Sequence, residues 1–145
     1  MCYFGVPIGE EKNKYLSHRN LYKQFPFDSK RKRMTTFIKS EEFPSQYRLF
    51  SKGGGEYATS YCKYYLDPEN GKIVQMNENC KRRIQESITN FNKDKLRTIY
   101  IAYKDITKEE FINYDKENDE GKLIDQYDMV FLAVFGFRNS FKDGL

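Results

Sequence analysis

The chain has 145 residues, a length that suits one compact domain and suffices for a packed core without a disulfide or metal staple. An aromatic content of 17% excludes a disordered chain, and a formal net charge of +4 favours anions in general without selecting one class. Three cysteines without metal-ligand spacing and one histidine argue against a disulfide framework, a metal cluster and histidine-based nucleophilic catalysis. Reduced, unreactive thiols in a cytosolic compartment are the better interpretation.

The first half of the chain predicts a hairpin of two strands. Residues 10–22 carry a weak helical pattern that ends before Pro26. Beyond it, Arg33–Ser40 and Tyr47–Lys52 are rich in β-branched and aromatic residues, which is typical of strands. The turn "EEFPS" separates them, so we expect the two strands to pair with each other.

Two helices are expected next. "EYATSYCKYYLD", Glu56–Asp67, has a helical spacing of apolar residues and ends before a proline and a glycine turn. A second helix is expected from about Asn79, because Ile84, Ile88 and Phe91 at i, i+4 and i+7 form one apolar stripe.

The last part of the chain predicts two buried strands around a short helix. Leu96–Lys104 is the clearest strand, and Thr107 with Glu110 three positions later predicts a capping box. Tyr127–Phe137 is expected to be a final buried strand, and its apolar run, Met129–Phe137, is about half the length needed to cross a bilayer as a helix. Strand pairs that precede helices predict an α+β fold, a single domain with a mainly antiparallel sheet flanked by helices.

"KGGG" is the first candidate binding element. Three glycines between a strand and an expected helix expose backbone N–H groups to an anion, and they also let a flat ring approach the backbone. The loop is not a Walker loop, because Lys52 precedes the glycines and Glu56 follows them. A plain corner between a strand and a helix is the alternative.

Two further stretches combine charge with a possible ligand. Phe27 precedes Arg31 and Lys32, a pairing that suits a stacked nucleobase and its phosphates, although a solvated basic patch has the same pattern. Arg97 opens its strand and is either a solvated end residue or a phosphate ligand. The acidic run at residues 109–120 is no catalytic pair, so the sequence favours binding over chemistry and contains no catalytic residue of its own.

Taken in order, "FPFDSKRKRM", "FSKGGGE" and "LRTIYIAYKD" resemble the nucleotide-binding domain of P-type ATPases, most closely that of plasma-membrane-type calcium pumps. The resemblance runs from about residue 25 to the end. It implies an ATP site in which Phe27 stacks on adenine, Lys52 and Gly53 line the base cavity, and Arg97 reaches the phosphates. It also implies contacts from the remaining site residues, which are Arg31, Lys32, Met34, Gly54 and Ile99.

The resemblance further implies a role within a longer pump. The D-K-T-G-T phosphorylation motif is absent from this sequence, so residues 1–145 are expected to be an excised nucleotide-binding domain. In that interpretation 1–24 is a variable part and 136–145 starts the return hinge toward the phosphorylation domain. ATP with Mg²⁺ is the expected ligand and the phosphorylation and actuator domains are the expected partners. The domain itself is expected to be a monomer on the cytoplasmic side of an integral membrane protein.

The sequence departs from that family at three points. Gly54 and Gly55 replace alanine and serine or proline, and Asn139 and Ser140 stand in place of an acidic–proline pattern. The acidic residue that would hold the adenine amino group is not identifiable.

A module that binds single-stranded nucleic acid, or a protein-interaction domain, is the alternative from another functional class.

Overall fold

The computed structural model describes residues 2–3, 6–7, 22–27, 29–114 and 123–138. Its core is a seven-stranded sheet in the order β3-β4-β5-β8-β9-β6-β7, and a separate two-stranded pair joins β1 to β2. The strands are β1 (Cys2–Tyr3), β2 (Val6–Pro7), β3 (Tyr22–Phe25), β4 (Arg33–Lys39), β5 (Tyr47–Gly54), β6 (Cys62–Leu66), β7 (Ile73–Gln75), β8 (Arg97–Ile106) and β9 (Met129–Phe137). The helices are η1 (Gly55–Tyr57), α2 (Ala58–Tyr61), α3 (Glu78–Lys93), α4 (Lys108–Asn113) and η2 (Ile124–Gln126).

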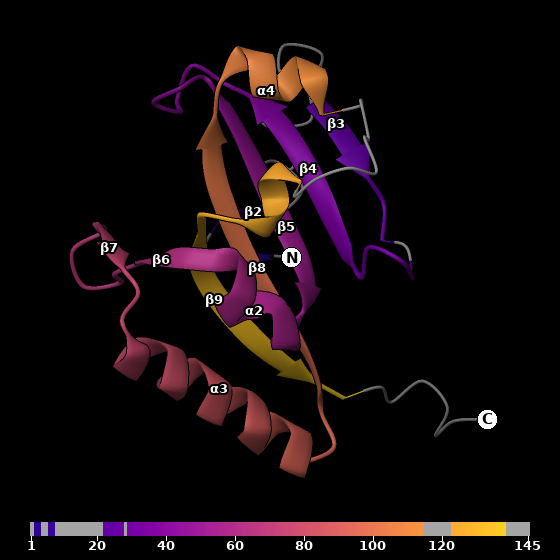
Figure 1. Ribbon diagram of the computed structural model, residues 1–145, viewed down its shortest axis with the longest axis vertical. Coiled ribbons are helices and arrows are strands. Elements are labelled where there is room, and N and C mark those ends of the chain that lie inside the picture. The colour runs from indigo at the N-terminus through magenta and orange to yellow at the C-terminus, as the bar shows by residue number, and fades with distance from the viewer. Residues whose placement is uncertain (1, 4–5, 8–21, 28, 115–122, 139–145) are drawn as a thin grey trace.

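The sheet is antiparallel except where β6 runs parallel to β9. The long strands β4, β5, β8 and β9 lie side by side, with α4 at one end and α3 at the other (Figure 1). The predicted α+β class, the hairpin of β4 and β5, and the antiparallel sheet are therefore confirmed. The expected helix at 10–22 falls almost entirely outside the described residues.

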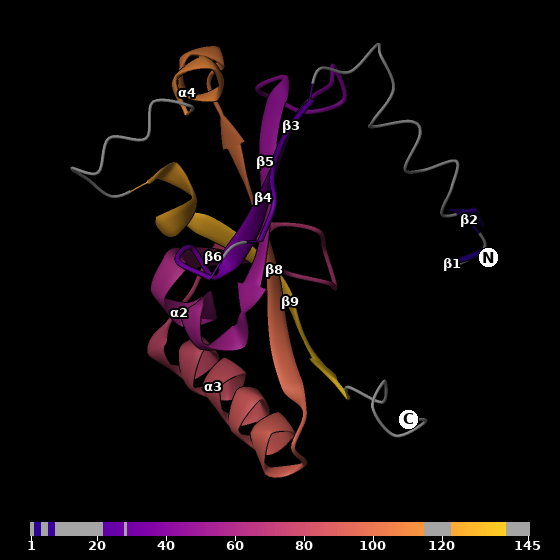
Figure 2. The same cartoon turned by 90° about the vertical axis from the view of Figure 1, so that its right-hand side faces the viewer.

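One face of the sheet is covered and forms the core. The helices α2, α3 and α4 lie on the same side of the sheet (Figure 2). Alternate residues of the central strands point to that side and are fully buried, among them Phe37, Leu49, Tyr100 and Ala102. The apolar stripe of α3 is confirmed as well, since Ile84 is buried and Ile88 packs against the core.

The helix expected at Glu56–Asp67 is wrong for its second half. The chain is helical only in η1 and α2, and Cys62 then begins β6. Tyr64 and Tyr65 pair with the adjacent strand β7 and with the distant strand β9, so strand partners on both sides satisfy their backbone groups. The aromatic side chains favour that pleated environment over a helix.

Local signals at helix starts are confirmed. The Thr107 hydroxyl accepts a hydrogen bond from the Glu110 amide at 3.1 Å, and the Glu110 carboxylate accepts one from the Thr107 amide at 2.8 Å.

Burial raises the pKa of the Cys62 thiol to about 12, which keeps it in the unreactive protonated form. Among the described residues, no helix combines the length and apolar character needed to span a membrane.

Candidate functional site

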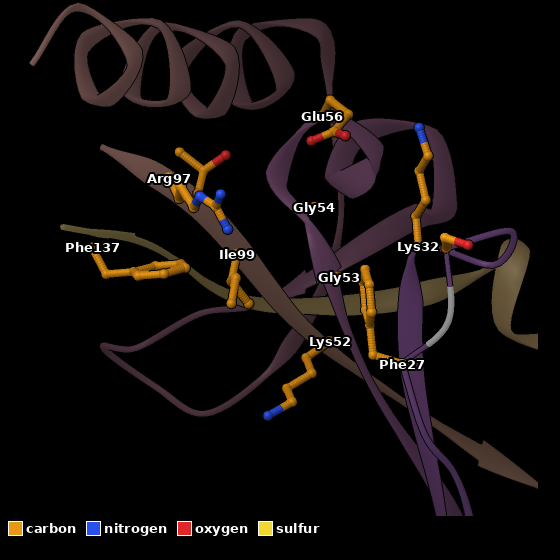
Figure 3. Close-up of a pocket in the computed structure, with 11 residues that line it drawn as sticks. Phe27, Lys32, Lys52, Gly53, Gly54, Glu56, Arg97, Ile99 and Phe137 are labelled. Atoms are coloured by element: carbon orange, nitrogen blue, oxygen red, sulfur yellow. The ribbon is translucent and has the colours of Figure 1, made fainter. Parts of the chain in front are cut away.

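A cavity of about 380 Å³ opens at the end of the sheet where β4 and β8 begin and β5 and β9 end (Figure 3). Segments far apart in the sequence therefore meet there. The described residues that line it are Phe27, Ser29, Lys32, Lys52, Gly53, Gly54, Glu56, Arg97, Thr98, Ile99 and Phe137. Seven of the nine residues expected to bind a ligand are among them, and Arg31 and Met34 are not.

Two of the three glycines lie in a strand and only Gly55 belongs to the following helix η1, so the run does not form the expected turn. Gly53 and Gly54 are the last residues of β5, and neither has a positive φ. Gly53 is required by a close approach, because a Cβ there would lie 2.8 Å from the Lys32 carbonyl oxygen and 2.9 Å from the Arg33 Cβ. For Gly54 the three atoms nearest to the same Cβ all belong to the carboxylate of Glu56, which ends a flexible side chain.

This difference predicts a large loss of stability for one substitution and almost none for its neighbour. We expect Gly53→Ala to lower the free energy of unfolding by about 1–3 kcal/mol, since β4 and β5 must separate to admit the methyl group. Gly54→Ala is the matched control and should change stability by less than about 0.5 kcal/mol, because the Glu56 side chain can move away. Urea denaturation of both variants measures the difference, and equal stabilities would contradict the close approach.

The segment before β4 presents Phe27 and Lys32 to the cavity. Phe27 is 61% exposed, which is unusual for a side chain of its size and leaves its ring free to stack on a ligand. Lys32 adopts a left-handed backbone conformation with φ of 53°. Its carbonyl oxygen lies 3.4 Å from the Gly54 amide, so this residue ties the segment to the end of β5.

Arg31 turns toward the covered side of the sheet. Its guanidinium donates hydrogen bonds to Thr35 at 3.1 Å, to the Tyr114 hydroxyl at 2.9 Å and to Asp125 at 3.2 Å. Met34 pairs with Lys52 across β4 and β5 and lines a smaller neighbouring hollow of about 230 Å³. Met34 is therefore near the cavity without lining it, whereas Arg31 takes part in a different structure.

That structure is a buried network around Asp125, which the sequence interpretation did not single out. Arg33 donates to both carboxylate oxygens at 2.9 Å, and Thr35 and Tyr114 donate to Oδ2 at 2.6 and 3.0 Å. Burial alone would raise the pKa of Asp125, but the hydrogen bonds from Arg33 and Thr35 and the charge of Arg33 outweigh it and lower the pKa below the usual value of an aspartate. Asp125 therefore stays ionised and holds Arg31 and Arg33 to the covered side.

The other wall of the cavity comes from β8 and β9. Arg97 and Ile99 are two residues apart on β8 and point to the same face, as alternation in a strand requires. Figure 3 shows Phe137 beside them and Phe27 on the far side of the cavity. Four lining residues were not predicted from the sequence, namely Ser29, Glu56, Thr98 and Phe137. For Phe137, the alternation of side chains along the last strand could have indicated that it shares a face with the site.

The lining carries more positive than negative charge. Lys32, Lys52 and Arg97 contribute three cations, and Glu56 is the one carboxylate among the described lining residues. Between the cations lie the exposed ring of Phe27 and the apolar side chain of Ile99. This combination suits a ligand with a flat ring at one end and an anionic group at the other.

Comparisons with known proteins show which family the chain resembles. Residues 2–144 match the family described as P-type ATPase, cytoplasmic domain N. Calcium-transporting ATPase PAT1 of Dictyostelium discoideum is 34% identical over 137 residues, which cover 94% of this chain and 11% of the relative. Plasma membrane calcium-transporting ATPase 2 of Oreochromis mossambicus is 32% identical over 104 residues, which cover 72% of this chain and 9% of the relative. The chain thus spans about a tenth of the length of these relatives.

Proposed function

The chain belongs to the P-type ATPase cytoplasmic domain N family, and on that basis we propose that its cavity binds ATP and positions it for phosphoryl transfer to an aspartate in a separate domain. One observation supports this most directly. Three sequence stretches that lie far apart, around Phe27, Lys52 and Arg97, converge on one cavity with an exposed ring and a cationic rim.

Each lining residue has a part in the proposed binding. Phe27 stacks on the adenine ring, while Lys52 and the glycine backbone of Gly53 and Gly54 surround the base. Arg97 contacts the phosphate chain, for which the guanidinium donors are suited, and Lys32 adds a further cation to the rim. The contribution to the reaction is position and charge, because bond breaking would occur at the aspartate of another domain.

The complete protein is proposed to be a cation pump, with calcium as the transported ion because the relatives named above are calcium-transporting ATPases. In that pump the chain would be the nucleotide-binding part and would work with phosphorylation and actuator domains. Mg²⁺ would accompany the triphosphate and supply charge neutralisation during transfer. No residue of this chain is assigned to hold the metal ion.

A site for single-stranded nucleic acid is less well supported. That alternative needs the four cations of "KRKR" to lie along the phosphate backbone of the nucleic acid. The side chains of Arg31 and Arg33 are only 12% and 3% exposed, however. Both are engaged with Asp125 on the covered side of the sheet. Two of the four positive charges therefore cannot contact the phosphates of a nucleic acid bound at the surface.

We expect ATP to bind saturably in an NMR titration of the ¹⁵N-labelled chain, with the largest shifts at amides near Phe27, from Lys52 to Gly54, and near Arg97. AMP should shift the first two groups, whereas GTP and a short poly-dT should do little. The titrations are run at two salt concentrations, because binding of an oligonucleotide depends steeply on salt. Salt-sensitive binding of poly-dT that is stronger than binding of ATP would show that the assignment is wrong.

A further inference from the structure

We propose that Phe137 is a second aromatic contact of the nucleotide and packs against the ribose next to Arg97, an inference that rests on the proposed function of the cavity. Phe137 ends β9 and lines the cavity while remaining 40% exposed. When a ligand covers a large apolar side chain that is exposed inside a cavity, apolar surface leaves water and the complex is stabilised.

The register of the sheet places Phe137 beside Arg97. The two residues are direct partners in the antiparallel pair of β8 and β9, so their side chains project from the same face of the sheet. Figure 3 shows Phe137 next to Arg97 and Ile99, and across the cavity from Phe27. The ring is therefore at the end where the phosphates are proposed to bind.

The order of groups in a nucleotide then identifies the contact. Phe27, before β4, takes the base, and Arg97, at the start of β8, takes the phosphates. The sugar lies between base and phosphates in any nucleotide, so the ring that lies beside Arg97 meets the sugar before it meets the base. The C–H groups of a ribose face offer the apolar surface that such a ring can cover.

The end of β9 is held in place by packing on its other face. Gly136, opposite Thr98, brings the backbone so close to α3 that a Cβ on it would lie 2.5 Å from the ring of Phe91. This contact fixes the last residues of the strand against the helix. The backbone that carries Phe137 is therefore already ordered, so little backbone conformational entropy is lost there when a ligand binds.

Phe135 provides a matched control on the same strand. It projects from the same face two residues earlier, pairs with Ile99 and is 49% exposed, but it is not among the described residues that line the cavity. A general effect of removing an exposed ring from β9 would appear in Phe135→Ala and Phe137→Ala alike. An effect of the proposed contact would appear only in Phe137→Ala.

The test is an NMR titration of the ¹⁵N-labelled chain and the two variants with AMP and with ATP. We expect Phe137→Ala to lower the affinity for both nucleotides by the same factor, roughly two- to tenfold, and Phe135→Ala to leave both affinities unchanged. An equal factor indicates the sugar, because a phosphate contact would weaken ATP binding more than AMP binding. In the ATP complex, nuclear Overhauser effects should join the Phe137 ring to ribose protons.

Two outcomes would overturn the inference. One is equal affinity in Phe137→Ala and Phe135→Ala, and the other is a Phe137 ring whose contacts are to the base alone. If the unsubstituted chain binds ATP and Phe27→Ala weakens that binding, either outcome rejects the role of Phe137 and leaves the ATP site in place. Absence of saturable ATP binding to the unsubstituted chain would reject both proposals together.

Discussion

Asp125→Asn is expected to lower the free energy of unfolding by about 3–5 kcal/mol, because it leaves the buried guanidinium of Arg33 without its counter-charge. The asparagine keeps the size of the side chain but replaces one acceptor oxygen by a donor. That donor would face Arg33, Thr35 or Tyr114, which all donate to the carboxylate. Urea denaturation followed by circular dichroism measures the loss.

Asp105→Asn is the matched control, since Asp105 accepts two hydrogen bonds from Arg48 at 2.7 and 3.1 Å in a similar two-point geometry. The two side chains of this pair are 26% and 20% exposed, so water screens the charges. We expect a loss of no more than about 1 kcal/mol. Similar losses in the two variants would show that burial of Asp125 does not decide its contribution.

The effect of Asp125 should also depend on pH in a defined direction. Its pKa in the folded state is lowered, so its contribution is fully present above the unfolded pKa of about 3.9 and is lost as pH falls through the folded pKa. The difference in stability between the unsubstituted chain and Asp125→Asn should therefore be constant above about pH 5 and should shrink below about pH 4. A constant difference down to pH 2 would contradict the lowered pKa.

Phe27→Ala is expected to weaken the binding of ATP and AMP by about 5- to 150-fold, the range expected for removal of one base-stacking aromatic. The phosphates contribute equally before and after the change, so both nucleotides should lose the same factor. Because Phe27 is 61% exposed, its truncation leaves no cavity in the core and stability should change by less than about 0.5 kcal/mol. Isothermal titration calorimetry gives the affinities.

Ile112→Ala is a suitable control for this measurement. Ile112 lies on α4, is 54% exposed and is absent from the described cavity lining, so its loss should leave nucleotide affinity unchanged. Full affinity in Phe27→Ala would contradict stacking on this ring. Equal losses in Phe27→Ala and Ile112→Ala would indicate a general effect of removing exposed apolar surface.

The sequence predicted elements whose signals are local. The hairpin of β4 and β5, the start of α4 at Thr107 and the apolar stripe of α3 each depend on residues close together in the chain, and all are confirmed. The helix through Tyr64 and Tyr65 is wrong because the partner β9 lies more than sixty residues later. A helical period within a short window cannot report a strand partner at that distance.

In the candidate site, too, the sequence predicted what local motifs carry and missed what depends on distant residues. The order of three motifs predicted seven residues that line one cavity, although ligand binding by them stays a prediction. Neighbouring letters in "KRKR" gave no sign that Arg31 and Arg33 would face Asp125 while Lys32 lines the cavity. That separation depends on a carboxylate more than ninety residues away and on the left-handed backbone of Lys32.

The place of β9 has a consequence for how this chain folds during synthesis. Of the seven strands of this sheet β9 comes last in the sequence, so it leaves the ribosome after the other six, and it lies between β8 and β6 in the interior of the sheet. Until it arrives, the hairpin of β6 and β7 has no strand linking it to the larger group of β3, β4, β5 and β8. A two-stranded hairpin is only marginally stable in water by itself. We therefore expect this sheet to be completed late, with the edges of β8 and β6 unpaired until β9 has emerged from the ribosome.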